Sequence, residues 1–303
     1  MAIQWFPGHM HKARKEIAKV IPQIDVVVEV LDARLPISSE NPLVETLRQN
    51  KPVIKVLNKS DLADPNRTKK WVRYFQELGA QSMPLRLDQK GELKRLIQLC
   101  RDAAPGRVDG DRPVRVLIMG IPNVGKSTLI NSLLGRKVAK VGNEPAVTKA
   151  QQRFVTHNGL AIYDTPGILW PKIEDPDSTL RLAASGAIKD TVMEYEEVAL
   201  YTLAFLLREY PALLQARFKL EALPEDANAM LDCVGRKRGC LRSGGIVDRH
   251  KAAELLVGDL RSGKLGRISL ETVGEWKEKR RLAALQAAEA EAETENTNES
   301  DRT

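Results

Sequence analysis

Short apolar runs alternate with amphipathic stretches over the first half of the chain. The apolar runs are rich in valine, isoleucine and leucine and cover residues 26–31, 53–57, 114–119 and 160–163. Between them, hydrophobic residues recur at helical spacing over roughly 66–79, 90–103 and 126–135. Continuous apolar strands that alternate with helices are typical of a parallel sheet buried on both faces. We therefore predict an α/β fold for this part of the chain.

The pattern changes after about residue 175, where the strand signal fades. Helical periodicity then covers residues 198–220, 252–261 and 270 to about 288. The last residues turn acidic and hold no bulky apolar side chain beyond Leu285, which is typical of a disordered tail. We predict three parts: an α/β domain over 1–178, a helical domain over 179–285 and a disordered acidic tail over 286–303.

The length of 303 residues favours two domains that each bury a core of their own. No apolar run approaches the roughly 18 residues that a membrane span needs. The N-terminus lacks the basic and then apolar pattern of a signal peptide. The three cysteines are too few and too scattered for a disulfide framework or a zinc site. We therefore expect a cytoplasmic protein with no membrane partner.

The formal net charge of +7 indicates a polyanionic partner. Basic side chains cluster in three stretches of the chain, at residues 11–19, 236–251 and 277–281. Two interpretations stay open at this point. These clusters either bind the phosphates of a nucleic acid or form an ordinary solvated surface.

The segment from Gly120 to Ser127 matches the phosphate-binding pattern Gly-x-x-x-x-Gly-Lys-Ser, directly after a predicted strand and before a predicted helix. Backbone N–H groups of such a loop surround the phosphates, and the following helix adds its positive end. Lys126 is expected to reach the outer phosphates, and the Ser127 hydroxyl is expected to bind Mg²⁺. The predicted nucleotide contacts of this loop are Asn123, Val124, Gly125, Lys126, Ser127 and Thr128.

The segment Asn58-Lys59-Ser60-Asp61 predicts which base is bound. A carboxylate at Asp61 accepts hydrogen bonds from the N1–H and 2-amino groups of guanine, and adenine lacks this pair of donors. Lys59 is expected to lie over the base, and Asn58 is expected to link this loop to the phosphate loop. A further base-supporting loop is expected near residues 85–87, with contacts from Arg86 and Leu87. The pattern therefore favours GTP over ATP.

Two further segments are expected to contact the γ-phosphate and its metal. Asp164-Thr165-Pro166-Gly167 ends a predicted strand, and its aspartate would hold Mg²⁺ through water. The Gly167 N–H would contact the γ-phosphate. Thr148 stands where a switch threonine closes on Mg²⁺, and the other interpretation is a threonine in a surface turn.

Two residues bear on the hydrolysis mechanism. Ile168 occupies the position of the glutamine that orients the attacking water in Ras-like enzymes, and an apolar side chain cannot do this. Hydrolysis therefore either takes its catalytic group from elsewhere or is slow until a partner binds. Asn123 lies within the phosphate loop, where its side chain is expected either to coordinate K⁺ beside the phosphates or to stabilise the loop.

The motifs occur in a circularly permuted order. The guanine motif at 58–61 precedes the phosphate loop, whereas the phosphate loop comes first in a conventional GTPase. Residues 104–113 form a polar connector rich in proline and glycine, and we expect them to join the two ends of the unpermuted domain. Every motif still follows a strand, at the edge of the sheet where such folds bind ligands.

This order, the opening Trp5-Phe6-Pro7-Gly8-His9-Met10, the phosphate loop and the stretch from Asp259 to Ile268 resemble the YlqF/RbgA family of bacterial circularly permuted ribosome-biogenesis GTPases. The resemblance covers residues 3 to about 272. It implies a circularly permuted P-loop GTPase fold, with a Ras-like parallel sheet covered by helices on both faces, followed by a small all-helical domain. It also implies GTP hydrolysis in a late step of large-subunit assembly, stimulated by the ribosomal particle and by potassium.

The resemblance assigns a catalytic role to His9, for which a solvated histidine is the other interpretation. The expected cofactors are GTP or GDP, Mg²⁺ and K⁺. The expected partners are the large ribosomal subunit precursor and its rRNA, bound by a monomer. Two other functions stay open: a P-loop kinase or ATPase, which would prefer ATP, and an RNA-associated module in which GTP is structural and scarcely hydrolysed.

Overall fold

The computed structural model describes residues 7–108, 112–137, 152–165, 173, 175–188 and 190–300. The chain forms two compact units, Met1–Leu270 and Glu271–Thr303. The first unit holds the sheet and the helices up to α11, and the second consists mainly of the helix α12 (Val273–Ser300). This helix includes most of the predicted acidic tail. The disorder of the tail and the domain boundaries at residues 178 and 285 stay predictions.

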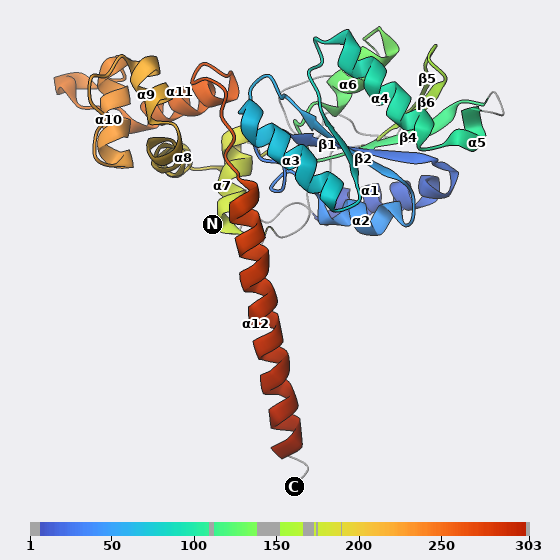
Figure 1. The fold of residues 1–303 in the computed structure, drawn as a ribbon. Helices are drawn as coiled ribbons and strands as arrows, with labels where there is room; N and C mark the ends of the chain where they lie inside the picture. Colours follow the sequence, from blue (N-terminus) through green and yellow to red (C-terminus); the bar gives the residue numbers. More distant parts are fainter. Residues whose placement is uncertain are drawn as a thin grey trace. The chain divides into compact units, whose positions relative to one another are not determined.

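In the described part of the chain, six strands form one sheet in the order β3-β2-β1-β4-β6-β5 (Figure 1). Their bounds are β1 Val26–Asp32, β2 Val53–Asn58, β3 Gln81–Pro84, β4 Val114–Met119, β5 Gln152–Val155 and β6 Leu160–Asp164. Five of them pair in parallel, which confirms the predicted parallel sheet. The exception is β5, which pairs antiparallel with β6 because a tight turn at residues 156–159 joins the two strands.

Helices cover both faces of the sheet, as the sequence predicts. They are α1 (Pro7–Val20), α2 (Pro42–Arg48), α3 (Pro65–Glu77), α4 (Lys90–Asp102), α5 (Pro105–Val108) and α6 (Lys126–Leu134). On one face, Val28 of β1 belongs to the core formed with α4 and α6. On the other face, Val27 packs with α1 and α2. The helix α3 joins this second face, where the Lys55 ammonium lies 5.1 Å from the ring centroid of Phe75.

In the described residues after the sheet, the main elements are helices, which confirms the helical periodicity predicted after residue 175. They are α7 (Pro176–Ser185), α8 (Tyr195–Glu209), α9 (Pro211–Phe218), α10 (Ala227–Lys237) and α11 (Arg249–Arg261). Their apolar faces extend the core of the sheet, and Leu203, Leu231 and Leu256 are fully buried in it. Among the helices that the structure describes, we find none with the length and apolar character of a membrane span.

Candidate functional site

The predicted nucleotide motifs meet at one edge of the sheet. Asn58 is the last residue of β2, Gly120 follows β4, and Asp164 is the last residue of β6. These strands run parallel, and β1 between β2 and β4 brings Asp32 to the same edge. Open α/β sheets bind their ligands beyond the carboxyl ends of the strands. The fold therefore gathers the described motif residues where a nucleotide is expected.

Two glycines shape the phosphate loop. Gly120 has a φ of 147°, and a Cβ at this position would lie 2.5 Å from the carbonyl oxygen of Val30. Gly125 has a φ of 98°, and a Cβ there would lie 2.3 Å from Asn58 Nδ2. A positive φ disfavours every larger residue, and the backbone oxygen of a central strand cannot move aside. The tight passage from β4 to α6 therefore requires glycine at both positions.

Asn58 links the guanine motif to the phosphate loop. Its buried side chain donates a hydrogen bond of 2.7 Å from Nδ2 to the Val124 carbonyl, which is the link that the sequence predicts. Ser60 extends the motif in the other direction, because its hydroxyl donates to the Leu85 carbonyl over 3.0 Å. This bond holds the guanine motif against the loop at residues 85–87.

The remaining predicted base contacts surround this junction. Asp61 is exposed at the end of the guanine motif. The Arg86 guanidinium pairs with Asp88 at 2.9 Å, and the Leu87 side chain packs at the margin of the core. Lys59 has a φ of 57°, and its ammonium donates to Asp32 Oδ2 over 3.0 Å. The stem of Lys59 is therefore fixed by a residue outside the motif.

Asp32 and Arg34 form a buried ion pair that no motif in the sequence predicts. Arg34 donates from Nε and Nη2 to the two oxygens of Asp32 over 2.9 and 2.8 Å. Each of the two residues is 2% exposed. Burial alone would raise the pKa of Asp32, but Arg34 and Lys59 outweigh burial and hold this pKa well below its usual value. Asp32 therefore stays ionised and presents a permanent negative charge to Lys59.

Lys126 opens α6 and is buried inside the phosphate loop. Its ammonium donates to the Ile121 carbonyl over 2.7 Å. Burial lowers the pKa of Lys126 to about 8, although the nearby charge of Asp164 opposes this shift. A phosphate in the loop would supply the negative charge that favours the protonated form.

We expect GDP to bind more weakly as the pH rises above about 8. In the empty site Lys126 loses its proton near pH 8, while a bound phosphate requires the charged form, so binding above this pH takes up a proton. The affinity for GDP should be level below pH 7.5 and about tenfold lower at pH 9. Titration calorimetry across this range measures the effect.

The unfolding of the empty protein should show the opposite trend. Because the unfolded chain keeps the Lys126 proton up to about pH 10.5 and the folded chain loses it near 8, this group adds stability as the pH rises between those values. The variant Lys126→Arg keeps its charge throughout and serves as the control. An equal decline of GDP affinity in this variant would show that another group titrates.

The residues suited to a metal ion lie beside Lys126. Ser127 is in the first turn of α6, and Asp164 is buried at the end of β6. The Thr165 hydroxyl donates to the Ile118 carbonyl over 2.8 Å and fixes the turn after β6. Hydroxyl and carboxylate oxygens are the ligands that Mg²⁺ prefers. Two predicted contacts, Thr148 and Gly167, lie outside the described residues, as do Ile168 and the side chain of His9.

The carboxyl end of α7, residues 183–186, collects side chains from three distant parts of the chain. Carbonyls at the end of a helix lack donors within the helix, so outside donors stabilise it. The donors here are Arg34 to Ser185 (3.4 Å), Asn123 to Gly186 (2.7 Å), and Arg261 to Ala183 (2.8 Å) and Ala184 (3.2 Å). One helix end thus contacts the loop after β1, the phosphate loop and α11.

Asn123 is part of this arrangement. The sequence leaves open whether it coordinates K⁺ or stabilises the loop. Its Nδ2 donates to the Gly186 carbonyl, so it does make a contact that stabilises the phosphate loop. Coordination of K⁺ by Asn123 stays a prediction.

A segment after α11 supports the guanine motif, and the sequence gives no sign of this contact. Arg267 donates from Nη2 to the Ser60 carbonyl over 2.8 Å and from Nε to the Ala63 carbonyl over 2.9 Å. The Ile268 N–H donates to the Leu62 carbonyl over 2.9 Å. These backbone contacts join residues more than 200 positions apart, which no local pattern can reveal.

Comparison with known proteins identifies similar sequences. The family model described as 50S ribosome-binding GTPase matches residues 115–217. The chain is similar to ribosome biogenesis GTPase A of Bacillus cereus, with 45% identity over 92% of this chain and 96% of that protein. It is also similar to ribosome biogenesis GTPase A of Thermotoga maritima, with 35% identity over 89% of this chain and 94% of that protein.

Two solved structures share the fold. GDP-bound YlqF matches with a TM-score of 0.63 and 30% identity, over 85% of this chain and 99% of that chain. GNP-bound YlqF from T. maritima matches with a TM-score of 0.61 and 31% identity, over 86% of this chain and 98% of that chain. These matches extend through both the sheet and the helices that follow it.

Proposed function

Because the chain belongs to the ribosome biogenesis GTPase A family, we propose that this GTPase binds a precursor of the large ribosomal subunit and hydrolyses GTP at a late step of its assembly. The observation that supports this proposal is the grouping of the nucleotide motifs at one edge of the sheet. Although the motifs are permuted, the hydrogen bond from Asn58 to Val124 joins the guanine motif to the phosphate loop at the ends of β2 and β4. We expect the protein to act in the cytoplasm as a monomer.

The described residues fit a Mg²⁺ ion at the phosphate loop. We assign the Ser127 hydroxyl and Thr148 as direct ligands and Asp164 as a ligand through water. Mg²⁺ bound there would neutralise charge on the β- and γ-phosphates. Ser127 follows Lys126 in the first turn of α6, and the buried carboxylate of Asp164 lies close enough to oppose the lowering of the Lys126 pKa by burial. These contacts support a cation between the loop and the end of β6.

Hydrolysis needs a group that replaces the missing glutamine. The apolar side chain of Ile168 cannot orient water, and we assign this role to His9. We further propose that Asn123 contributes a ligand to K⁺, which would stabilise the charge of the transition state as an arginine finger does. Gly167 would contact the γ-phosphate through its backbone N–H.

The test is GTP turnover by the full chain with and without precursor large subunits, in potassium and in sodium buffers. We expect the particles to stimulate turnover, and potassium to support it better than sodium. We also expect more protein to co-sediment with the particles in a GTP analogue than in GDP. Intact GTP binding without stimulation in any buffer would favour the alternative, a module in which GTP is structural. Displacement of GTP by ATP at comparable concentrations would contradict the guanine site.

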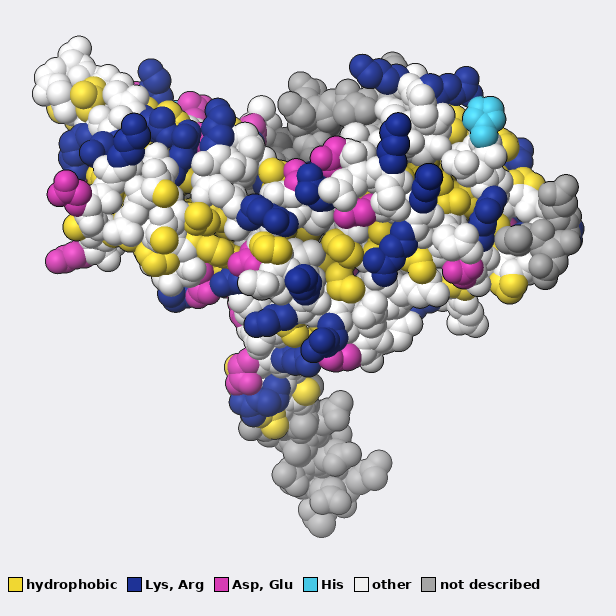
Figure 2. All heavy atoms as spheres, turned by 45° about the horizontal axis from the view of Figure 1, so that its top comes forward, with side chains coloured by type: hydrophobic (Ala, Val, Ile, Leu, Met, Phe, Trp, Pro, Cys, Tyr) yellow, Lys and Arg dark blue, Asp and Glu magenta, His cyan; other side chains and the backbone are white. Residues whose placement is uncertain are grey.

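A basic cluster on the helical region is our candidate for the main rRNA contact. Figure 2 shows Lys and Arg side chains gathered on one face over this region. The members of the cluster are Arg236, Lys237, Arg238, Arg242, Arg249 and Lys251. Some are partly committed within the protein, as in the pairs Arg242–Asp248 and Arg249–Glu196. Others, such as Arg236 and Lys237, are exposed at the end of α10, which suits binding of RNA phosphates in a salt-sensitive manner.

We propose that α7 conveys the nucleotide state to this helical region. The helix follows the second switch in the chain, and its carboxyl end accepts hydrogen bonds from Asn123 of the phosphate loop and from Arg261 of α11. A change at the phosphate loop therefore moves Asn123, which bonds to the same end of α7 as Arg261 of α11 does. Such shared contacts give two sites a common element whose position both can bias.

Replacing Arg261 with alanine is expected to uncouple the two regions. The change removes the donors to Ala183 and Ala184 and the ion pair with Asp190, while the hydrogen bond from Asn58 to Val124 that joins the nucleotide motifs stays in place. We expect the affinity for GTP to stay within about twofold and the stimulation by particles to fall about tenfold, since coupling energies of this kind are about 1–3 kcal/mol. Single-turnover hydrolysis with and without particles measures both effects.

The control for Arg261→Ala is Arg217→Ala. The Arg217 side chain is 25% exposed, close to the 23% of Arg261, and it likewise pairs with an aspartate, Asp259. Both its hydrogen bond and its ion pair go to Asp259 of α11 and not to α7. Equal loss of stimulation in both variants would show that general weakening of the helical region, and not the α7 contact, is responsible.

A further inference from the structure

A pocket of about 360 Å³ lies at the edge of the sheet opposite to the nucleotide site. Asp25 directly precedes β1, Pro52 directly precedes β2, and Arg112 lies just before β4. These are the amino ends of the strands, whereas the nucleotide motifs follow the carboxyl ends. The pocket is therefore separate from the site that binds GTP.

The connector created by the permuted order builds one wall of this pocket. The segment after α4 contributes Ala104, Pro105 and Arg107, and Arg112 follows at the far end of the same connector. In a domain with the conventional order these residues would belong to the two chain ends. The pocket is thus a product of the rearranged chain.

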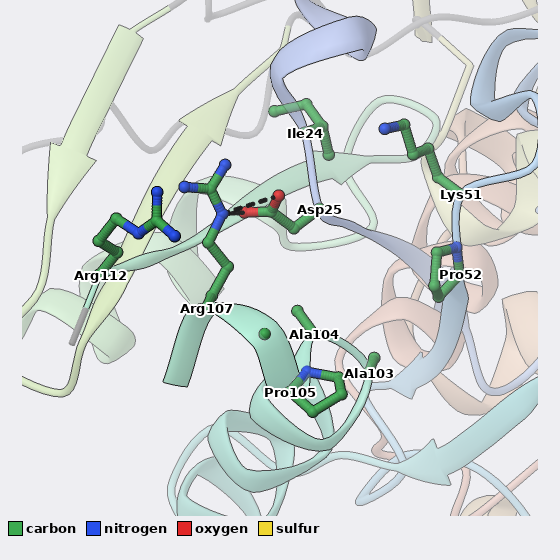
Figure 3. Close-up of a pocket in the computed structure, with 10 residues that line it drawn as sticks. Ile24, Asp25, Lys51, Pro52, Ala103, Ala104, Pro105, Arg107 and Arg112 are labelled. Carbon is green, nitrogen blue, oxygen red and sulfur yellow. Dashed lines mark hydrogen bonds and ion pairs between the residues drawn. The ribbon is translucent and has the colours of Figure 1, made fainter. Parts of the chain in front are cut away.

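The lining combines positive charge with an apolar floor. Three cationic side chains, Lys51, Arg107 and Arg112, face one carboxylate, Asp25, which leaves a net charge of +2. Figure 3 shows Arg107 and Arg112 on one side and Lys51 on the other, with Pro105 and the neighbouring alanines lining the space between. A pocket of this size accepts a small molecule or one unit of a polymer.

The cations of the pocket differ in whether they already pair with a carboxylate. Arg107 lies 3.1 Å from an Asp25 oxygen, and Arg115 donates to the same carboxylate over 3.0 Å. Burial would raise the pKa of Asp25, but the hydrogen bonds from Arg115 and Arg107 outweigh burial and keep this pKa below its usual value. Asp25 therefore stays ionised and is matched by two arginines. Lys51 and Arg112 are then the cations available to an anionic ligand.

We propose that this pocket binds one nucleotide of single-stranded ribosomal RNA, with its two flanking phosphates at Lys51 and at Arg112 and the base against the apolar floor. Single-stranded RNA is recognised by bases that leave the stack and pack on apolar surfaces or arginine planes, while cations hold the backbone. The proposal rests on the proposed function, because it gives the same GTPase a second contact with rRNA.

Other anionic ligands fit the lining less well. An acidic peptide would satisfy Lys51 and Arg112 but would leave the floor of Pro52 and Pro105 uncovered. A duplex presents its phosphates on a broad surface and keeps its bases stacked, so it cannot place a base in a pocket of this volume. A single unstacked nucleotide uses both the charge and the floor.

The experiment measures the affinity of the GDP-bound full chain for a fluorescent single-stranded RNA oligomer between 50 and 200 mM KCl. The pocket variant is Lys51→Glu with Arg112→Glu. The matched control is Lys69→Glu with Arg73→Glu, which reverses the same two residue types on the exposed face of α3. We expect a loss of about tenfold or more in the pocket variant and about twofold or less in the control.

A neutral variant, Lys51→Gln with Arg112→Gln, guards against misfolding caused by charge reversal. Each phosphate contact that is lost should reduce the slope of log affinity against log salt by about 0.7. The neutral variant should therefore show a slope smaller by about 1.4 while GDP affinity stays unchanged. An unchanged slope in the neutral variant would overturn the proposal.

The remaining outcomes separate this inference from the proposed function. If wild type binds neither the oligomer nor precursor subunits, the rRNA-binding part of the proposed function fails together with the pocket. If wild type binds and Arg236→Glu with Lys237→Glu weakens binding, but the pocket variant does not, only the pocket inference fails. Equal sensitivity of the annealed duplex to the pocket variant, or displacement of the oligomer by polyglutamate at matched charge, would also overturn the inference.

Discussion

Replacing Asp61 with asparagine is expected to weaken GTP binding by about 10²- to 10⁴-fold and to make xanthosine triphosphate the preferred nucleotide. The Asp61 carboxylate would accept two hydrogen bonds, from the N1–H and the 2-amino group of guanine. Each hydrogen bond to a charged group contributes about 1.5–3 kcal/mol. The amide N–H groups of an asparagine would face the 2-amino group of guanine, and two donors cannot form a hydrogen bond. Xanthine has a carbonyl at that position, and its oxygen can accept a hydrogen bond from the amide.

Competition of GTP, xanthosine triphosphate and ATP against a fluorescent GDP measures this change for each protein. The control is Asp88→Asn, the same substitution at an exposed carboxylate that pairs with Arg86 in the neighbouring loop. We expect the control to alter each affinity by about twofold or less, as surface substitutions do. A variant at Asp61 that still prefers GTP would show that this carboxylate does not select the base.

Replacing Arg34 with alanine is expected to lower the free energy of unfolding by about 3–5 kcal/mol. The Arg34 guanidinium holds both oxygens of Asp32 and also donates to the Ser185 carbonyl. Its removal leaves the buried carboxylate with the single cation of Lys59. A buried charge that loses a partner costs far more than the pair contributed, because the desolvation of the remaining charge is no longer offset.

Urea unfolding at pH 7 measures this loss, and Arg48→Ala is its control. Arg48 makes a similar two-pronged contact with Glu45, but the Glu45 side chain is 71% exposed. We expect the control to lose about 1 kcal/mol or less, because water screens and replaces such pairs. A similar loss in both variants would show that burial does not set the strength of the Asp32–Arg34 pair.

The lowered pKa of Asp32 predicts how the stability of the folded protein changes at acidic pH. Because the pKa of Asp32 is lowered in the folded protein, its contribution to stability is present above the ordinary aspartate value near 3.8 and is lost as the pH falls below it.

The double variant Asp32→Asn with Arg34→Met removes both charges. We expect it to lose less stability than the two single changes added together, since residues in direct contact couple by about 0.5–3 kcal/mol.

Much of the sheet could be predicted because buried parallel strands leave continuous apolar runs. All seven positions of β1 are buried, and the predicted run at residues 26–31 lies within this strand. The edge strand β5 could not be found in this way. Its Val155 side chain is 57% exposed and the strand has only four residues, so it leaves no apolar run. The seven-residue helix α2 is likewise too short to show a clear period.

The nucleotide motifs could be predicted because their spacing itself encodes the backbone geometry. Gly120 and Gly125 stand where the chain must pass close to Val30 and Asn58, so the pattern of glycines reports the fold of the loop. The residues that contact this loop from distant parts of the chain could not be predicted in this way. The bond from Asn123 to the end of α7 joins residues 63 positions apart and depends on how distant elements pack. No local signal marks such a contact.

The hydrogen bonds from Arg267 and Ile268 also determine at what stage of synthesis the guanine motif is held in place. Arg267 bonds to carbonyls that were translated 204 and 207 residues earlier. While the guanine motif is emerging from the translating ribosome, the segment that will hold it has not been made, although the domain around it begins to fold. A nascent chain therefore completes this loop only after Arg267 has been made and has left the ribosome. A fragment cut before α11 ends would contain every nucleotide motif and still lack the full support of its guanine loop.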